Sequence, residues 1–265
     1  MPRWAYRSDV QITWLAPVSW GRGLAARTTA PAAALIIGGL GTLAVFLVSL
    51  PMGFLAKSLE DSVDWPAFRW IHPRVHDSPF TSAMNLLTKM GNIFEIRVIC
   101  VVGALLLGLA WRRRFYIPPI VILSTFLLEK FSQKLLAKIV DRGHPPTTLG
   151  TFPSGGCARL LTIYGVMLFL GLLVMPTLAR KWKFTAWTVL TVAAWLEAFS
   201  RTYLSKHWLT DAVAGLIFGA LLLLVVISAT AALTRTVVPF RADHSGTEPD
   251  GLKVIPSGSV GHADQ

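Results

Sequence analysis

The chain has 265 residues, of which 53% are hydrophobic and 15% are charged, and its mean hydropathy is +0.56. Soluble globular domains are about 45–50% apolar and about 25% charged. This composition excludes a disordered or nucleic-acid-binding chain despite the net charge of +11. It also argues against the alternative of an unusually apolar soluble bundle. We therefore expect an integral membrane protein.

Apolar runs separated by polar or basic intervals predict an all-α membrane fold with six spans. A bilayer-spanning helix takes about 20 apolar residues, and the expected spans are 31–56, 93–111, 117–139, 155–179, 184–203 and 211–234. Pro51 is expected to kink or end the first span. The polar interval 57–92 is expected to form an external loop with one or two helical pieces lying across the bundle.

The charge distribution predicts an orientation in the plasma or inner membrane. Residues 1–30 are expected to form an interfacial segment, 31–236 the membrane domain, and 237–265 a disordered cytoplasmic tail. Residues 1–30 and 235–265 and the intervals 112–114 and 180–183 together hold 13 Lys and Arg, against four in 57–92. Because positive residues stay cytoplasmic, both termini should face the cytoplasm, and the loops 57–92, 140–153 and 204–210 should face outward.

The interval between the last two predicted spans carries ionisable residues that hydropathy does not explain. Its pattern is Ser-Arg, five residues, His, three residues, Asp, with Arg201, His207 and Asp211 at the ionisable positions. The planar guanidinium of arginine suits phosphate oxygens. A carboxylate behind a histidine fixes its tautomer and stabilises the cation that forms. The alternative is that these three residues only anchor a loop at the membrane interface.

This pattern resembles the third signature of the type 2 phosphatidic acid phosphatase superfamily and is complete from Ser200 to Asp211. The resemblance covers about residues 93–234. It implies a six-helix bundle that hydrolyses a lipid phosphate through a phosphohistidine on His207, with Asp211 orienting that residue and Arg201 holding the phosphate. It implies no metal and no cofactor, and leaves the oligomeric state open.

The second signature of the family is Pro-Ser-Gly-His, whereas residues 153–156 of this chain are Pro-Ser-Gly-Gly. Gly156 thus stands where the family has the histidine that protonates the leaving group. The backbone amides of Ser154, Gly155 and Gly156, at the start of the fourth predicted span, can still bind phosphate. A plain glycine turn before a helix is the alternative, although it leaves the Pro-Ser pair unexplained. We expect the phosphate cradle to be kept and the proton donor to be lost. Arg159, one turn further on, is a candidate for phosphate contact or for interface anchoring.

The first signature, a lysine followed after six residues by Arg-Pro, is degenerate. His144 precedes Pro145 where the family has its arginine, and the lysine position falls on Ala137. Arg142 is expected to supply the missing guanidinium. His144 is expected to supply the leaving-group proton that Gly156 cannot.

Lysines recur every four residues in the third predicted span, at Lys130, Lys134 and Lys138. Ionisable residues inside a span usually face a polar interior, so we expect Lys134 or Lys138 to bind phosphate. Snorkelling to the interface is the alternative for Lys138.

The leading interpretation is a metal-independent membrane lipid phosphatase acting on a polyprenyl diphosphate or phosphate, or on phosphatidate. A diphosphate substrate has the better leaving group and needs less acid catalysis. Because Gly156 supplies no acid, this modestly favours a polyprenyl diphosphate over phosphatidate. One alternative is a phosphotransferase, in which an alcohol replaces water. Another is an impaired accessory protein that binds lipid phosphate; Gly156 and Ala137 favour it, whereas the complete third signature opposes it. A transporter fits less well, because the polar residues gather at one face and give no path through the membrane.

Overall fold

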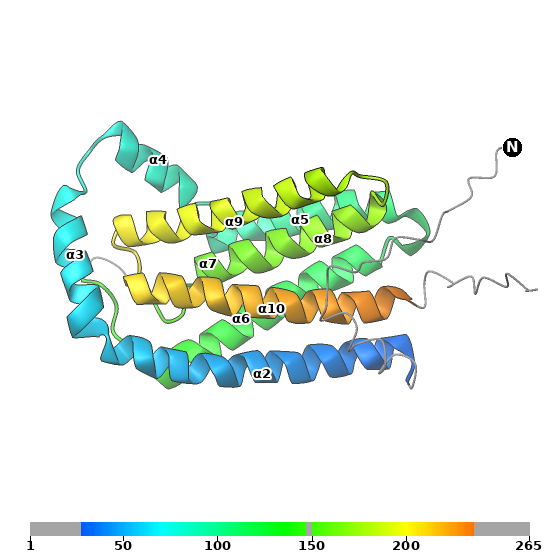
Figure 1. Cartoon of the computed structure of the whole chain (residues 1–265), viewed down its shortest axis with the longest axis horizontal. Coiled ribbons are helices and arrows are strands. Elements are labelled where there is room, and N and C mark those ends of the chain that lie inside the picture. Colours follow the sequence, from blue (N-terminus) through cyan, green and yellow to red (C-terminus); the bar gives the residue numbers. More distant parts are fainter. Residues whose placement is uncertain (1–27, 147–149, 236–265) are drawn as a thin grey trace, which may run out of the picture.

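The structure is a computed structural model that describes residues 28–146 and 150–235, and in these ranges every regular element is helical. The long helices run roughly along one axis, with α6 inclined to the others (Figure 1). They are α2 (Ala30–Ser58), α5 (Ile93–Trp111), α6 (Ile117–Val140), α9 (Arg180–Tyr203), α10 (Leu209–Arg235) and the stack of α7 (Gly155–Arg159), η4 (Leu160–Tyr164) and α8 (Gly165–Val174). The expectations for residues 1–27 and 237–265 lie outside the described residues.

Four helices of the described chain are long and apolar enough to cross a bilayer: Ala30–Ser58, Ile93–Arg114 including the short η3 (Arg112–Arg114), Gly155–Val174 and Leu209–Thr234. Large apolar side chains cover their outer surfaces, and Leu35 and Leu109 are 77% and 76% exposed. Such a surface suits lipid rather than water. The all-α membrane fold is therefore confirmed. Helices α6 and α9 have 24 residues each and lie in the same bundle, but they are more polar.

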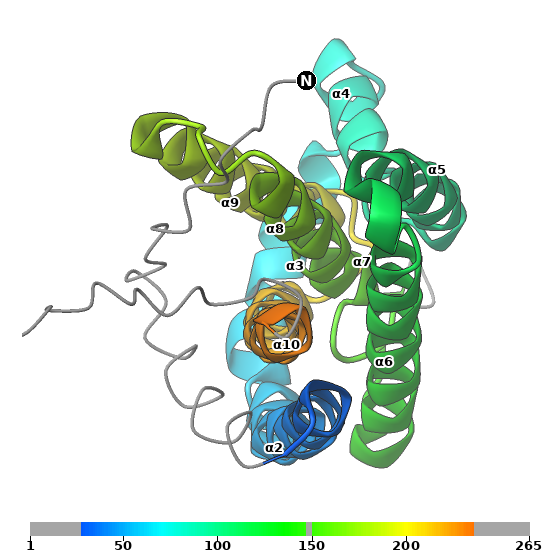
Figure 2. The same cartoon turned by 90° about the vertical axis from the view of Figure 1, so that its right-hand side faces the viewer.

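Helix α10 is central in the bundle, between α2, α6 and the α8–α9 pair (Figure 2). Phe218 and Leu222 of α10 pack with side chains of α2, α6 and α7. Further along, Leu223, Val226 and Ile227 pack against α6 and α8. Because α10 is held from several sides, its first turn has a fixed position relative to the ends of its neighbours.

Two glycines let α10 approach α7 closely. A Cβ on Gly215 would lie 2.5 Å from the carbonyl oxygen of Ser154, and one on Gly219 would lie 2.9 Å from the backbone of Ala158. The spacing of four residues places both glycines on one face of α10, as in the small-residue interfaces of membrane helices. This contact brings the segment that begins at Ser154 against the start of α10.

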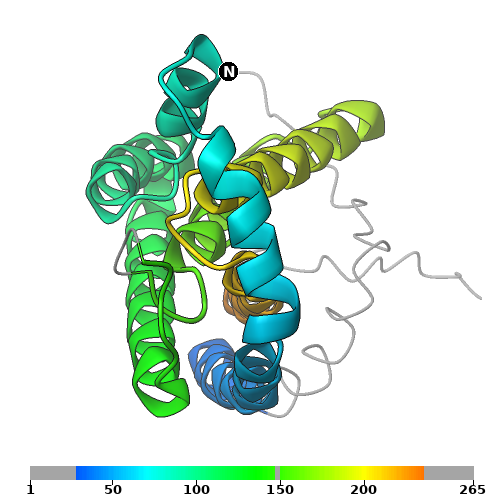
Figure 3. The ribbon, with the colours of Figure 1, turned by 90° about the vertical axis from the view of Figure 1, so that its left-hand side faces the viewer.

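The segment between α2 and α5 folds over one end of the bundle. It contains η1 (Glu60–Asp64), α3 (Trp65–Ile71), η2 (His72–Arg74) and α4 (Pro79–Leu87). Figure 3 shows α3 running across the ends of the longer helices. The expected helical pieces across the bundle are therefore present.

The structure corrects two expectations about helix ends. Pro51 does not end the first span, because helix α2 continues through it to Ser58, with buried residues on both sides of the proline. The lost hydrogen bond is tolerated because membrane helices re-satisfy freed backbone groups locally and packing holds the helix. The span predicted to reach residue 179 ends at Val174, ahead of a turn that contains Pro176.

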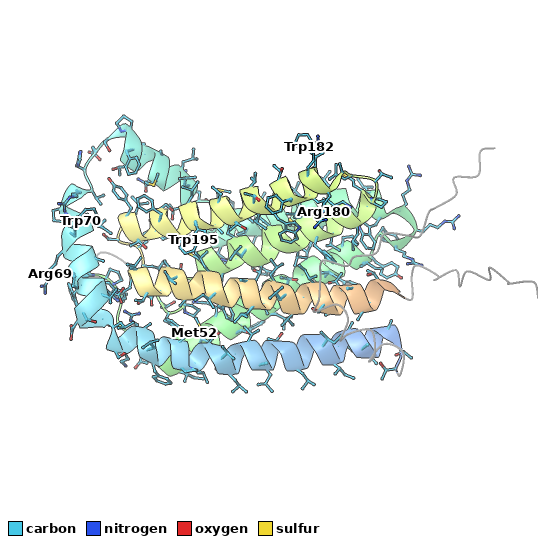
Figure 4. The ribbon with its side chains drawn as sticks, in the orientation of Figure 1. Met52, Arg69, Trp70, Arg180, Trp182 and Trp195 are labelled. Carbon is cyan, nitrogen blue, oxygen red and sulfur yellow. The ribbon has the colours of Figure 1, made fainter. Side chains whose placement is uncertain are left out.

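Aromatic and basic side chains mark both ends of the bundle (Figure 4). Arg69 and Trp70 lie at the end covered by α3, and Arg180 and Trp182 lie at the opposite end. Trp70 is 63% exposed and Trp182 is 57% exposed. Indole and guanidinium groups prefer the membrane–water interface, so the two ends have the composition of two interfaces.

Candidate active site

The turn between α9 and α10 places His207 at the end of the bundle covered by α3. Helix α9 ends in a Schellman motif, in which the Lys206 amide donates to the Arg201 carbonyl at 2.8 Å and the Ser205 amide donates to the Thr202 carbonyl at 3.0 Å. Ser205 has the left-handed conformation that this motif requires, with φ 54°. The chain therefore reverses sharply, and His207 directly precedes the first turn of α10.

His207 is a buried, neutral imidazole. Its residue is 9% exposed, and its Nδ1 has no hydrogen-bond partner among the described residues. Burial lowers the pKa of His207 to about 3, and Arg201, Arg159 and Lys206 lower it further in the same direction. The ring lines a cavity of about 10 Å³ beneath α3, which is room for about one water molecule. A neutral imidazole is the form that a nucleophilic histidine needs.

Asp211 lies in the first turn of α10 and is fully buried. Its Oδ1 accepts from Nη1 of Arg142 at 2.8 Å, and its Oδ2 has no hydrogen-bond partner in the described part of the chain. No hydrogen bond joins His207 to Asp211 among the described residues, although each has a buried atom that lacks a partner. The expected support of the imidazole by Asp211 is therefore absent from this conformation, and the pairing stays a prediction.

Arg142 is occupied by protein groups, contrary to the expectation that it binds phosphate. Its guanidinium makes four hydrogen bonds, and its side chain is 0% exposed. The acceptors are Glu60, Asp64, Thr210 and Asp211. Because buried carboxylates hold this guanidinium, it is not open to a phosphate here.

Arg201 lies directly over Gly156. Its Nε donates to Glu197 at 2.6 Å, and its Nη2 donates to the carbonyl of Thr88 at 3.2 Å and to Oδ1 of Asn92 at 3.1 Å. A Cβ on Gly156 would lie 2.0 Å from Cζ of Arg201. The guanidinium thus fills the space that a side chain at position 156 would enter.

Ser154, Gly155 and Gly156 begin α7 and are buried. The Ser154 amide donates to the Asp211 carbonyl at 3.0 Å, while the Ser154 Oγ has no partner among the described groups. The first amides of a helix lack intrahelical acceptors and favour anions. Together with the guanidinium of Arg201, this segment forms an electropositive cradle close to the start of α10.

Arg159 lies on the other side of this cradle. A Cβ on Gly155 would be 2.8 Å from Nη1 of Arg159. Its Nε donates to the Gly91 carbonyl at 3.1 Å, and its Nη1 lies 3.6 Å from Glu129. The side chain is only 13% exposed. Of the two roles expected for Arg159, anchoring at the membrane interface therefore does not fit this position.

The lysines of α6 do not face the interior, so the expected polar stripe was wrong. Lys134 and Lys138 are exposed, and Lys130 is partly exposed. The face of α6 toward the core contains Glu129 and Leu136, each 0% exposed. A helical residue lies about 100° round the axis from its neighbour, so Lys130, Lys134 and Lys138 lie roughly 100° to 180° round the axis from Glu129 and turn outward.

His144 is exposed, and its Nδ1 lies 2.9 Å from the Pro145 carbonyl oxygen. No contact joins its ring to His207 or Arg201 among the described residues. Its role as a proton donor stays a prediction.

Sequence reasoning missed Asp64, Glu60 and Asn92. Asp64 precedes Trp-Pro, which is typical of a helix start, but nothing in the sequence indicates its contact with α10. In the described chain, no group of three or more His, Cys, Asp or Glu side chains is arranged to hold a metal ion.

A sequence model of the PAP2 superfamily matches residues 122–235, which carry His207, Asp211, Arg201 and the cradle. A curated relative, phosphatidylglycerophosphatase B of Bacillus subtilis strain 168, is 27% identical over 150 residues, which are 54% of this chain and 71% of the relative. Over this segment the chain resembles the PAP2 superfamily.

The fold agrees with this assignment. The crystal structure of a transmembrane PAP2-type phosphatidylglycerolphosphate phosphatase from Bacillus subtilis superposes with a TM-score of 0.61 at 20% identity. The match covers 76% of this chain and 98% of that one. The chain therefore has the same fold as that protein.

Proposed function

We propose that this protein is a PAP2-type integral-membrane lipid phosphatase that works through a phosphohistidine on His207. The observation that supports this most strongly is the placement of a neutral, buried imidazole beside an electropositive cradle. A nucleophile needs its lone pair free and the phosphoryl oxygens need positive groups near them. The match of residues 122–235 to the PAP2 superfamily supports the same reaction class.

In the proposed reaction, a ring nitrogen of His207 attacks phosphorus as the bond from phosphorus to the leaving oxygen breaks. The other ring nitrogen keeps its proton, and Asp211 accepts a hydrogen bond from it once substrate is bound. Catalytic hydrogen bonds are often long or absent in unliganded enzymes and form in the complex. Water then attacks the phosphohistidine, which releases inorganic phosphate and returns the neutral imidazole. The cycle uses no metal and no cofactor.

The phosphoryl oxygens would be bound by groups at the cradle, namely Arg201, Ser154, Arg159 and the amides of Gly155 and Gly156. Of these, Ser154 Oγ is a buried polar atom without a hydrogen-bond partner among the described residues. Lys134 and Lys138, exposed on α6, would attract anionic headgroups rather than touch the reacting phosphate.

The proposed substrate is a lipid phosphate drawn from the bilayer, of the polyprenyl diphosphate, polyprenyl phosphate or phosphatidate type. The curated relative is named for phosphatidylglycerophosphate, which belongs among the candidates. Because Gly156 supplies no acid, a diphosphate should be cleaved more readily than an alkyl monophosphate, for which His144 would donate the proton to the leaving oxygen. A phosphotransferase using the same residues, and a lipid-phosphate-binding accessory protein, remain the alternatives.

We also propose that all six long helices cross the membrane, with both termini cytoplasmic and the site facing outward. At about 1.5 Å per residue, the 24 residues of α6 or α9 extend about 36 Å, which exceeds a hydrocarbon core of about 30 Å. The basic interval Arg112–Arg114 and the start of α9 lie at the end opposite α3, as the positive-inside rule requires.

Phosphate release from purified protein in detergent with EDTA tests the proposal. The substrates are undecaprenyl diphosphate and monophosphate, phosphatidate and phosphatidylglycerophosphate, each run beside His207→Ala. Release that survives EDTA and is lost in His207→Ala is the expected result. No release from any of these lipids, by protein whose unfolding midpoint shows it to be folded, would favour the accessory role. Release that persists in His207→Ala would exclude the phosphohistidine.

A further inference from the structure

Three charged side chains from distant parts of the chain are buried together beneath α3. Arg142 follows α6, Asp64 ends η1 and Asp211 begins α10, and all three side chains are 0% exposed. Nη2 of Arg142 donates to Asp64, and Nη1 donates to Asp211 at 2.8 Å. Glu60, 27% exposed, lies 3.4 Å from the Arg142 Nε. One guanidinium is therefore shared among three carboxylates.

Asp64 also caps α10 from outside the helix. Its Oδ1 accepts from the Thr210 amide at 3.0 Å, and its Oδ2 accepts from the Thr210 hydroxyl at 2.7 Å. The first amides of a helix need such acceptors. Here the acceptor comes from the segment between α2 and α3, so the position of η1 fixes the first turn of α10 and, within it, Asp211.

The charges in this cluster do not balance. A buried ion pair that serves stability alone matches one cation with one anion, because each unpaired buried charge is costly. Two fully buried carboxylates share one guanidinium here, and each makes ionisation of the other less favourable. Asp211 Oδ2 is buried without a partner in the described chain, which leaves this oxygen available as an acceptor. The group that would use it is an imidazole becoming cationic, and His207 is four residues away along the chain.

We propose that Asp64 and Arg142 are positioning residues for the reaction. Arg142 holds one oxygen of Asp211, and Asp64 holds both Arg142 and the amide of Thr210, so the second oxygen of Asp211 is kept in place for His207. This inference rests on the proposed function, in which His207 is the nucleophile. Under this inference, Arg142, near the degenerate first signature, binds carboxylates rather than phosphate. It also gives a catalytic role to η1, which lies outside the segment matched by the family model.

Asp64→Asn separates the hold on Arg142 from the helix cap. Asparagine caps a helix about as well as aspartate and keeps an acceptor for Thr210, but it loses the ion pair with Arg142. We expect kcat to fall about tenfold or more with KM within about threefold, since only the transition state loses stabilisation. Asp61→Asn is the matched control, because Asp61 is an exposed carboxylate in the same turn; its kcat should equal that of the wild type.

Binding of orthovanadate, followed by tryptophan fluorescence, separates this inference from the proposed function. Wild type that binds no vanadate, or His207→Ala that binds it equally, would refute the phosphohistidine itself. Two results would overturn the positioning role while the wild type still binds vanadate. One is an Asp64→Asn protein with the same kcat and vanadate affinity as Asp61→Asn. The other is an Asp64→Asn protein with a lower unfolding midpoint but an unchanged kcat. If Asp64→Asn does not fold, Arg142→Lys replaces it. Lysine keeps the charge but cannot bind two carboxylates side by side, so an unchanged kcat there would also overturn the inference.

Discussion

Restoring the histidine of the family's second signature should damage this protein rather than improve it. In Gly156→His, and equally in Gly156→Ala, the new Cβ would lie 2.0 Å from Cζ and 2.2 Å from Nε of Arg201. Ordinary contact begins at 3.4 Å, so the guanidinium must move by about 1.4 Å. The backbone cannot yield toward Gly91 instead, because the Gly156 carbonyl oxygen already lies 2.5 Å from the position of a Gly91 Cβ.

The movement would break the 2.6 Å bond between Arg201 and Glu197, whose side chain is 0% exposed. Breaking a buried ion pair from one side costs about 3–5 kcal/mol. For a domain of this size, that cost corresponds to an unfolding midpoint lower by about 10 °C. If the displaced guanidinium also binds the phosphoryl group, losing about 3 kcal/mol of transition-state stabilisation lowers kcat/KM about 100-fold.

The assay is phosphate release in detergent, together with tryptophan fluorescence during heating. Gly39→Ala is the matched control, because a Cβ there meets nothing within 4 Å and alanine favours a helix by about 1 kcal/mol over glycine. It should retain full activity. A Gly156→His protein that releases phosphate from an alkyl phosphate faster than the wild type would refute the reasoning, since the space for a histidine would then be free.

Three further predictions concern charge and protons. Because the pKa of His207 is lowered from 6.5 to about 3, the unfolded chain takes up a proton that the folded protein does not. The free energy of unfolding is therefore at its maximum above about pH 6.5, and it falls by at most about 1.4 kcal/mol per pH unit below that pH. Between pH 6.5 and 5 the wild type should lose about 2 kcal/mol more than His207→Gln, seen in unfolding midpoints; parallel curves would contradict a neutral His207. Arg159→Gln should destabilise by about 3–5 kcal/mol because Glu129 is left buried. If Arg159 binds phosphate, Arg159→Gln should also raise KM about tenfold. Adding Glu129→Gln should then restore the unfolding midpoint but not KM, whereas recovery of both would show that Arg159 and Glu129 form a purely structural pair. His144→Ala should spare an aryl phosphate and slow an alkyl phosphate about 100-fold if His144 is the acid; equal losses on both would exclude that role.

The membrane fold could be predicted because it depends on composition and run length. The same reasoning failed along α6, where the regular spacing of lysines suggested an inward stripe. Spacing shows that residues share a face but not which face is buried. That choice was made by Glu129 and Leu136, which pack toward α7 and α10. The face that contains Glu129 and the face that contains Lys130 start one residue apart, and the sequence does not show which of them is buried until the neighbouring helices are placed.

The site could be predicted only in part, for a similar reason. Fixed-spacing motifs indicated His207, Asp211 and residues 154–156 as candidates, because each motif is local in the chain. Asp64 acts on α10 across 146 residues, and no local pattern encodes such a contact. A detectable signal did exist for the approach of α10 to α7, since Gly215 and Gly219 have the spacing of a small-residue helix interface.

The two departures from the family signatures are each matched by a second feature of this chain. Where the second signature lacks its histidine, Arg201 lies in the vacant space and is held there by Glu197 and Asn92. Near the degenerate first signature, Arg142 is held by Asp64 and Asp211. Random loss of function would leave a cavity or an unpaired cation at both places, whereas both guanidinium groups lie in ordered, buried ion pairs. The pattern therefore favours an active site that has been rearranged over one that has decayed.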